Sequence, residues 1–99
     1  MLFRSRRVLA YLELYPEPGR SLAAVDVTIT VRQADSPELH LSMPAAISTG
    51  GDGRAVARAV LPVEHLAPGR YLVRASVTDA GRALGFVERT FGVEGPARR

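Results

Sequence analysis

A chain of 99 residues and 10.7 kDa has room for one hydrophobic core, so the sequence predicts a single domain spanning residues 1–99. Hydrophobic residues make up 46% of the chain and charged residues 23%, a balance that excludes both a disordered and a membrane-spanning protein. The formal charge is +3, but all thirteen basic residues are arginines scattered along the chain, which argues against a concentrated polyanion site.

Residues 7–15 predict a first strand, because apolar residues recur there at every second position. One face carries Val8, Ala10, Leu12 and Leu14, and the other carries Leu9, Tyr11, Glu13 and Tyr15. The face with Glu13 is expected to point outward, with its tyrosines partly covered. Arg6-Arg7 before an apolar run is loosely similar to a twin-arginine signal, but the run stops at Glu13 and is too short for a secretory signal.

The clearest alternation follows, at residues 25–32. Val25, Val27, Ile29 and Val31 alternate with Asp26, Thr28, Thr30 and Arg32, which predicts a half-buried strand. A short third strand is expected at 39–43, ended by Pro44. Residues 45–49 are either a small fourth strand or a crossing segment, and the glycine-rich stretch 50–53 predicts a tight turn.

The second half of the chain continues this pattern. Residues 54–63 predict a strand with an alanine-rich face that needs a bulky neighbour, and 64–67 form at most one helical turn. A strand over 71–78 is followed by a hairpin turn at 79–82. The last strand, 83–93, changes the parity of its apolar residues, which predicts a β-bulge between Gly85 and Arg89. The core then covers about residues 7–93, with a flexible tail at 94–99.

Six to seven short strands without an amphipathic helix predict an all-β fold, an antiparallel β-sandwich of immunoglobulin-like type. Tyr71 follows Pro68-Gly69 at the start of a strand. That position predicts a tyrosine corner, in which a buried phenol hydroxyl bonds to the backbone a few residues upstream. The buried Cys-Trp-Cys set of antibody domains is absent, because the chain has neither cysteine nor tryptophan.

The stretch 61–93, with Leu-Ala-Pro-Gly-Arg-Tyr at 66–71 and Thr-Asp-Ala-Gly at 78–81, resembles immunoglobulin-like and fibronectin-like accessory domains of large bacterial proteins. It is most similar to those C-terminal to von Willebrand A-type domains, and residues 8–15 fit their first strand. The resemblance implies a spacer or interaction surface without catalysis. It carries over no metal-binding residue, because the Asp-x-Ser-x-Ser motif is absent. A fragment of such a protein would be exported, whereas a complete chain would be cytoplasmic.

No catalytic residue, cofactor or metal site is expected. The two histidines, His40 and His65, are both predicted at the surface, and with no cysteine a zinc site would have to recruit carboxylates from distant loops. The glycine-rich stretch 50–53 lacks the Lys-Ser/Thr of a phosphate-binding loop and is interpreted as a turn.

Two functional hypotheses remain, and an enzyme is a distant third. The first is a structural or protein-interaction module that binds a protein partner, a neighbouring domain or a second copy by strand addition; its candidate face is Leu9, Tyr11, Tyr15 and Leu72. The second is a polyanion-binding domain that uses Arg54, Arg58, Arg70 and Arg74 on two strands expected to be neighbours. Nucleic acid is disfavoured, because no aromatic residue is interleaved with these arginines.

Overall fold

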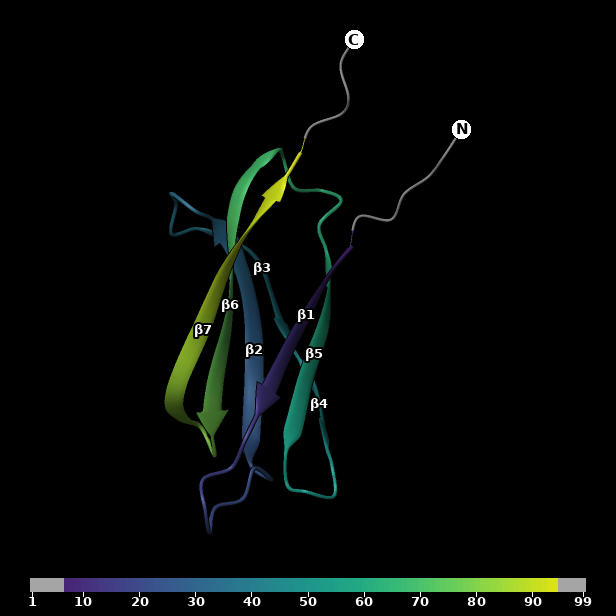
Figure 1. The fold of residues 1–99 in the computed structure, drawn as a ribbon. Coiled ribbons are helices and arrows are strands. Elements are labelled where there is room, and N and C mark those ends of the chain that lie inside the picture. The colour runs from purple at the N-terminus through teal and green to yellow at the C-terminus, as the bar shows by residue number, and fades with distance from the viewer. Residues whose placement is uncertain (1–6, 95–99) are drawn as a thin grey trace, which may run out of the picture.

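Residues 7–94, which the structure describes, form seven antiparallel strands in two sheets (Figure 1). This computed structural model confirms the all-β prediction; the described residues include no helix. The strands are β1 (Arg7–Leu14), β2 (Val25–Gln33), β3 (Leu39–Pro44), β4 (Ala46–Thr49), β5 (Ala55–Pro62), β6 (Gly69–Asp79) and β7 (Arg82–Val93). Beyond Glu94, the predicted tail lies outside the described residues, as does Arg6 of the signal-like motif.

One sheet has the order β1-β5-β4 and the other β3-β2-β6-β7. The core lies between them, and its largest contribution comes from β2, whose apolar face is fully buried as its alternation predicted. The alanine face of β5 is buried against the same cluster, with Ala57 at 2% exposure. Small side chains on β5 therefore leave room for the branched side chains of β2.

The segment after β3, which the sequence predicted as either a short strand or a crossing segment, is both. β3 ends at Pro44 opposite Thr28 in the four-stranded sheet, while Ala46 pairs with Arg58 in the three-stranded sheet. Ala45 lies between the two and donates its N–H to the carbonyl of Val27 at 2.9 Å. The chain therefore crosses from one sheet to the other within a single residue and continues as a short strand.

The predicted tyrosine corner is confirmed. Tyr71 is 1% exposed, and its hydroxyl donates a 2.6 Å hydrogen bond to the carbonyl of Ala67. The ring stacks on Phe91 and meets His40 edge-on, with centroids 5.7 Å apart in both pairs. The stretch 64–67 contains no helical turn; a single hydrogen bond from the Leu66 N–H to the Val63 carbonyl closes it.

The predicted bulge exists in β7, but its predicted position is wrong. Val77 pairs with Gly85 and Thr78 with Ala83, so the extra residue is Leu84. The hairpin turn, with Ala80 and Gly81 both at positive φ, fixes the pairing of β6 with β7 next to the turn. The extra residue of β7 is therefore accommodated close to the turn. Phe86 then stays on the outer face.

The sandwich departs from the constant-type immunoglobulin strand order, in which the second strand lies between the first and the fifth. Here β2 lies between β3 and β6, and β1 pairs directly with β5. Among the described strands, the two outermost strands of each sheet have one unpaired edge: β1 and β4 in one sheet, β3 and β7 in the other. The unpaired edges of β1 and β7 lie on the side that faces the viewer in Figure 1.

Candidate protein-interaction surface

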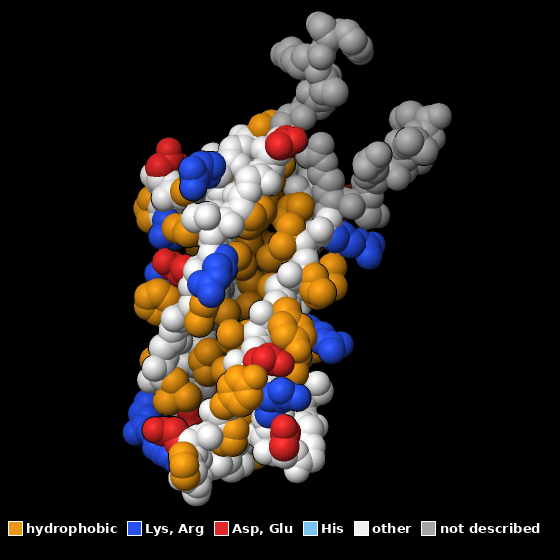
Figure 2. Space-filling view, in the orientation of Figure 1, with side chains coloured by type: hydrophobic (Ala, Val, Ile, Leu, Met, Phe, Trp, Pro, Cys, Tyr) orange, Lys and Arg blue, Asp and Glu red, His pale blue; other side chains and the backbone are white. Residues whose placement is uncertain are grey.

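The free edges of β1 and β7 face each other across an apolar groove of about 300 Å³, and we call this region the open side. Figure 2 looks onto it and shows hydrophobic side chains along its length. Val8, Ala10 and Leu12 point into the groove from β1 but are only half-buried. Val87 lines the β7 wall and is 38% exposed. The inner faces of both edge strands thus remain partly uncovered on this side.

The outer face of β1, continued by Tyr15 directly after the strand, carries three of the four residues of the candidate interaction face. Leu9, Tyr11 and Tyr15 are 62%, 54% and 65% exposed. Val60 of β5, which pairs with Leu9, extends this apolar surface. Leu72 does not join it: it is half-buried and lies on β6, in the opposite sheet.

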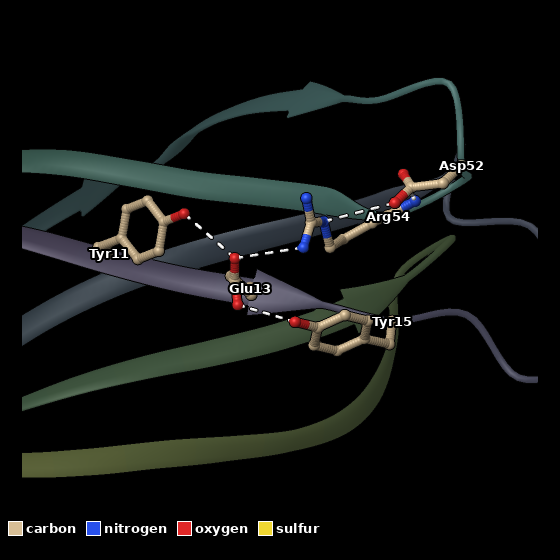
Figure 3. Close-up of polar contacts among 5 residues, drawn as sticks. All are labelled: Tyr11, Glu13, Tyr15, Asp52 and Arg54. Atoms are coloured by element: carbon tan, nitrogen blue, oxygen red, sulfur yellow. Dashed lines mark hydrogen bonds and ion pairs between the residues drawn. The ribbon is translucent and has the colours of Figure 1, made fainter.

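A polar cluster organises the outer end of β1 (Figure 3). The Glu13 carboxylate accepts hydrogen bonds from the Tyr15 hydroxyl at 2.8 Å and the Tyr11 hydroxyl at 3.3 Å. Arg54 forms ion pairs with Glu13 and with Asp52, each with an N–O distance of 3.7 Å. The Tyr15 side chain, followed by the two carboxylates, raises the pKa of Arg54 above its ordinary value. Because arginine is already charged at neutral pH, this shift leaves the charge of Arg54 unchanged there.

The expectation that the strands of the four arginines are neighbours is wrong. Arg58 lies on β5 of the three-stranded sheet and Arg54 directly precedes that strand, whereas Arg70 and Arg74 lie on β6 of the other sheet. The connection after β5 carries the chain across the sandwich, so the arginines divide between two outer faces. Strand alternation identifies outward residues but does not say which sheet they belong to.

Besides Arg54, two more of these arginines are engaged with neighbouring side chains. Arg74 forms a 2.7 Å ion pair with Glu88 on β7, and its guanidinium lies 4.0 Å from the centre of the Phe86 ring. The guanidinium of Arg58 lies 5.8 Å from the centre of the Tyr11 ring. Part of the exposed aromatic surface is therefore covered by arginine rather than by the core.

The histidines do not form a site: His65 is exposed in the loop after β5, and His40 touches Tyr71. Within residues 7–94, no group of three or more His, Cys, Asp or Glu side chains could hold a metal ion. Over the same residues, no helix is long and apolar enough to cross a membrane.

The β7 wall is the part of the open side that sequence reasoning missed. Val87 and Phe91 line the groove from a strand of twelve residues with a free edge, and Leu84 and Phe86 of the same strand are exposed outside the groove. The parity change in this strand was the available signal, because it indicated that apolar residues point to both faces. The sequence could not show which of the two faces lacks a covering strand, because that depends on the order of strands in the sheets.

Comparison with protein-family models, curated proteins and solved structures found no match to this chain. We therefore infer function from the chemistry and geometry of the surfaces described above, because a sandwich fold is compatible with many functions.

Proposed function

We propose that this chain is a non-catalytic protein-interaction module of a larger bacterial protein or assembly, and that it binds by strand addition at the open side. One observation carries the proposal: two unpaired strand edges flank an apolar groove of about 300 Å³. Unpaired edges offer backbone donors and acceptors to an extended segment, and the groove offers apolar contact to alternate side chains.

The edge of β1 is poorly protected against such pairing. Natural edge strands are commonly blunted by proline, by a bulge or by an inward-pointing charge. β1 has none of these between Val8 and Leu12, and its register with β5 is continuous. On β7, Arg89 lines the groove and supplies one such protective charge. We therefore take β1 as the main site of strand addition.

The proposal includes kinship with the immunoglobulin-like accessory domains that accompany von Willebrand A-type domains. The two packed sheets and the hydrogen bond from Tyr71 to Ala67 support it. The location of β2 in the four-stranded sheet would be this module's departure from the constant-type order.

Site-specific photo-crosslinking in the full-length protein tests the proposed function. A benzophenone amino acid would replace Leu9 on β1, Val87 on β7, or Thr28, an exposed control residue on a strand paired on both sides. We expect protein crosslinks at the first two positions and none at Thr28. Equal labelling at all three positions, or none at Leu9 and Val87, would contradict the proposal.

Heparin chromatography tests the polyanion alternative. With the arginines divided between two faces, we expect elution below about 0.15 M salt, because only multi-contact binding survives screening at that ionic strength. Retention above this salt that is lost in both Arg58→Glu and Arg70→Glu would favour polyanion binding instead.

A further inference from the structure

We propose that the occupant of the open side is a second copy of this chain, whose β1 pairs antiparallel with β1 about a twofold axis at Ala10. This inference rests on the proposed function and deepens it by naming the partner. Three features of β1 support it: the symmetry of its side chains, the location of the groove, and the remaining hydrogen-bonding capacity of Glu13.

The outer face of β1 is complementary to itself when the strand is reversed. With Ala10 opposite the partner's Ala10, Arg7 lies opposite the partner's Glu13, and Leu9 opposite the partner's Tyr11. Each ion pair and each apolar pair then occurs twice. Opposite charges and aromatic-aliphatic pairs directly across an antiparallel ladder are stabilising. A twofold interface requires this kind of self-complementarity.

This register also satisfies the geometry of a continuous sheet. A twofold axis perpendicular to the sheet keeps each face on its own side, so outward residues must pair with outward residues. Arg7, Leu9, Tyr11 and Glu13 all belong to the exposed face of β1. Val8 and Leu12 belong to the inner face and pair with each other across the axis. A shift by one residue would break this correspondence.

The groove is centred on the same residue. Its β1 lining runs from Val8 to Leu12, with Ala10 in the middle. An axis through Ala10 therefore brings the grooves of the two copies together, and each copy supplies apolar cover to the other. The centre of the side-chain symmetry and the centre of the groove are independent observations that coincide.

The carboxylate of Glu13 can accept a further donor. It accepts from Tyr11 and Tyr15 and pairs with Arg54, whereas an ionised carboxylate has about four acceptor positions. Its side chain is 37% exposed. Arg7 is an exposed residue at the start of β1. The partner's Arg7 can therefore approach Glu13 without displacing the contacts that hold the cluster.

Sedimentation of charge-reversed variants tests the partner and the register together. Arg7→Glu places a second carboxylate opposite the partner's Glu13, and Glu13→Arg places a second guanidinium opposite the partner's Arg7. Each variant alone should dimerise with a Kd about tenfold or more weaker than the unaltered chain, because two exposed ion pairs become two repulsions. An equimolar mixture should form a heterodimer, because every opposed pair is then of opposite charge.

Arg70→Glu is the matched control, since it makes the same charge change on the outer face of the other sheet. It should dimerise like the unaltered chain. A concentration-independent monomer of 10.7 kDa for the unaltered chain would overturn the proposal. Dimers indifferent to both reversals, or a mixture that does not associate, would overturn it too.

A disulfide provides a second readout that does not depend on the charge variants folding. Residues directly opposite in an antiparallel ladder have Cα atoms about 4.5 or 5.5 Å apart, within the range for a disulfide. The chain has no cysteine, so Ala10→Cys introduces a single thiol. It should oxidise to a covalent dimer, whereas Thr28→Cys should not. Failure of Ala10→Cys to crosslink overturns the register, while protein crosslinks at Leu9 to a different protein would leave the proposed function standing.

Discussion

Tyr71 combines the largest fully buried side chain of the domain with a hydroxyl that must find a partner inside the fold. Its 2.6 Å hydrogen bond to the Ala67 carbonyl ties the loop after β5 to the start of β6. Because the partner is a main-chain atom four residues upstream, the contact depends on the loop conformation and on the Pro68-Gly69 turn before the strand. The sequence motif alone was sufficient to predict it.

Tyr71→Phe should lower the free energy of unfolding by about 1 kcal/mol, because it removes one buried hydrogen bond and keeps the ring. Urea denaturation followed by circular dichroism measures the change. Tyr11→Phe is the matched control: it removes a hydroxyl whose bond to Glu13 is exposed, and should stay within about 0.5 kcal/mol. An unchanged midpoint for Tyr71→Phe would contradict the corner.

Ala80 adopts a φ of +52°, the only described residue other than glycine with a positive φ. This conformation costs an ordinary L-residue about 1–2 kcal/mol, and asparagine tolerates it better. Ala80→Asn should therefore raise the free energy of unfolding by about 0.5–1 kcal/mol, measured in urea. Ala23→Asn, at an exposed turn without positive φ, should have no such effect. Equal responses of the two variants would argue against strain at Ala80.

At the level of single strands, alternation was a reliable guide to which side chains enter the core. β2 and β5 bury the residues that their patterns predicted. Alternation could not assign strands to sheets, because both sheets of a sandwich direct their apolar faces at the same core. For this reason the prediction that the strands of Arg58 and Arg70 are neighbours was wrong. The prediction that Leu72 shares a face with Leu9 was wrong for the same reason.

Ile29→Ala in β2 should cost about 2–5 kcal/mol, since Ile29 is 2% exposed and its truncation leaves a cavity. Thr28→Ala, the neighbouring outward residue, should be close to neutral. Chemical denaturation of both variants gives the comparison. A larger loss for the threonine would mean that the strand is turned inside out.

Only one part of the open side could be predicted from the sequence. The apolar outer face of β1, with Leu9 and Tyr11, could be predicted from periodicity. The groove behind it could not, because its second wall is β7, near the other end of the chain, and its existence depends on β2 being in the other sheet. Long-range sheet order is decided by packing of the whole molecule rather than by any local pattern.

Arg89 is the charged residue that lines the groove, and pairing of two copies would bring two such side chains to the joined grooves. Its guanidinium donates to the Glu88 carbonyl at 2.8 Å. Arg89→Leu should therefore tighten the dimer by removing a repulsion and adding apolar contact. Sedimentation at several concentrations measures it, with Arg82→Leu, outside the groove, as control. Weaker association of Arg89→Leu would count against contact between the two grooves.

Arg7, at the start of β1, and Val93, at the end of β7, lie at the same end of the molecule (Figure 1), because Arg7 pairs with Pro62, Val93 pairs with Gly69, and a short loop joins these two partners. A force that draws Arg7 and Val93 apart would open the β1–β5 and β6–β7 ladders from this end, breaking their hydrogen bonds one after another instead of all together. A domain of this geometry yields at low tension. It is therefore poorly suited to transmit a pulling force that acts between Arg7 and Val93.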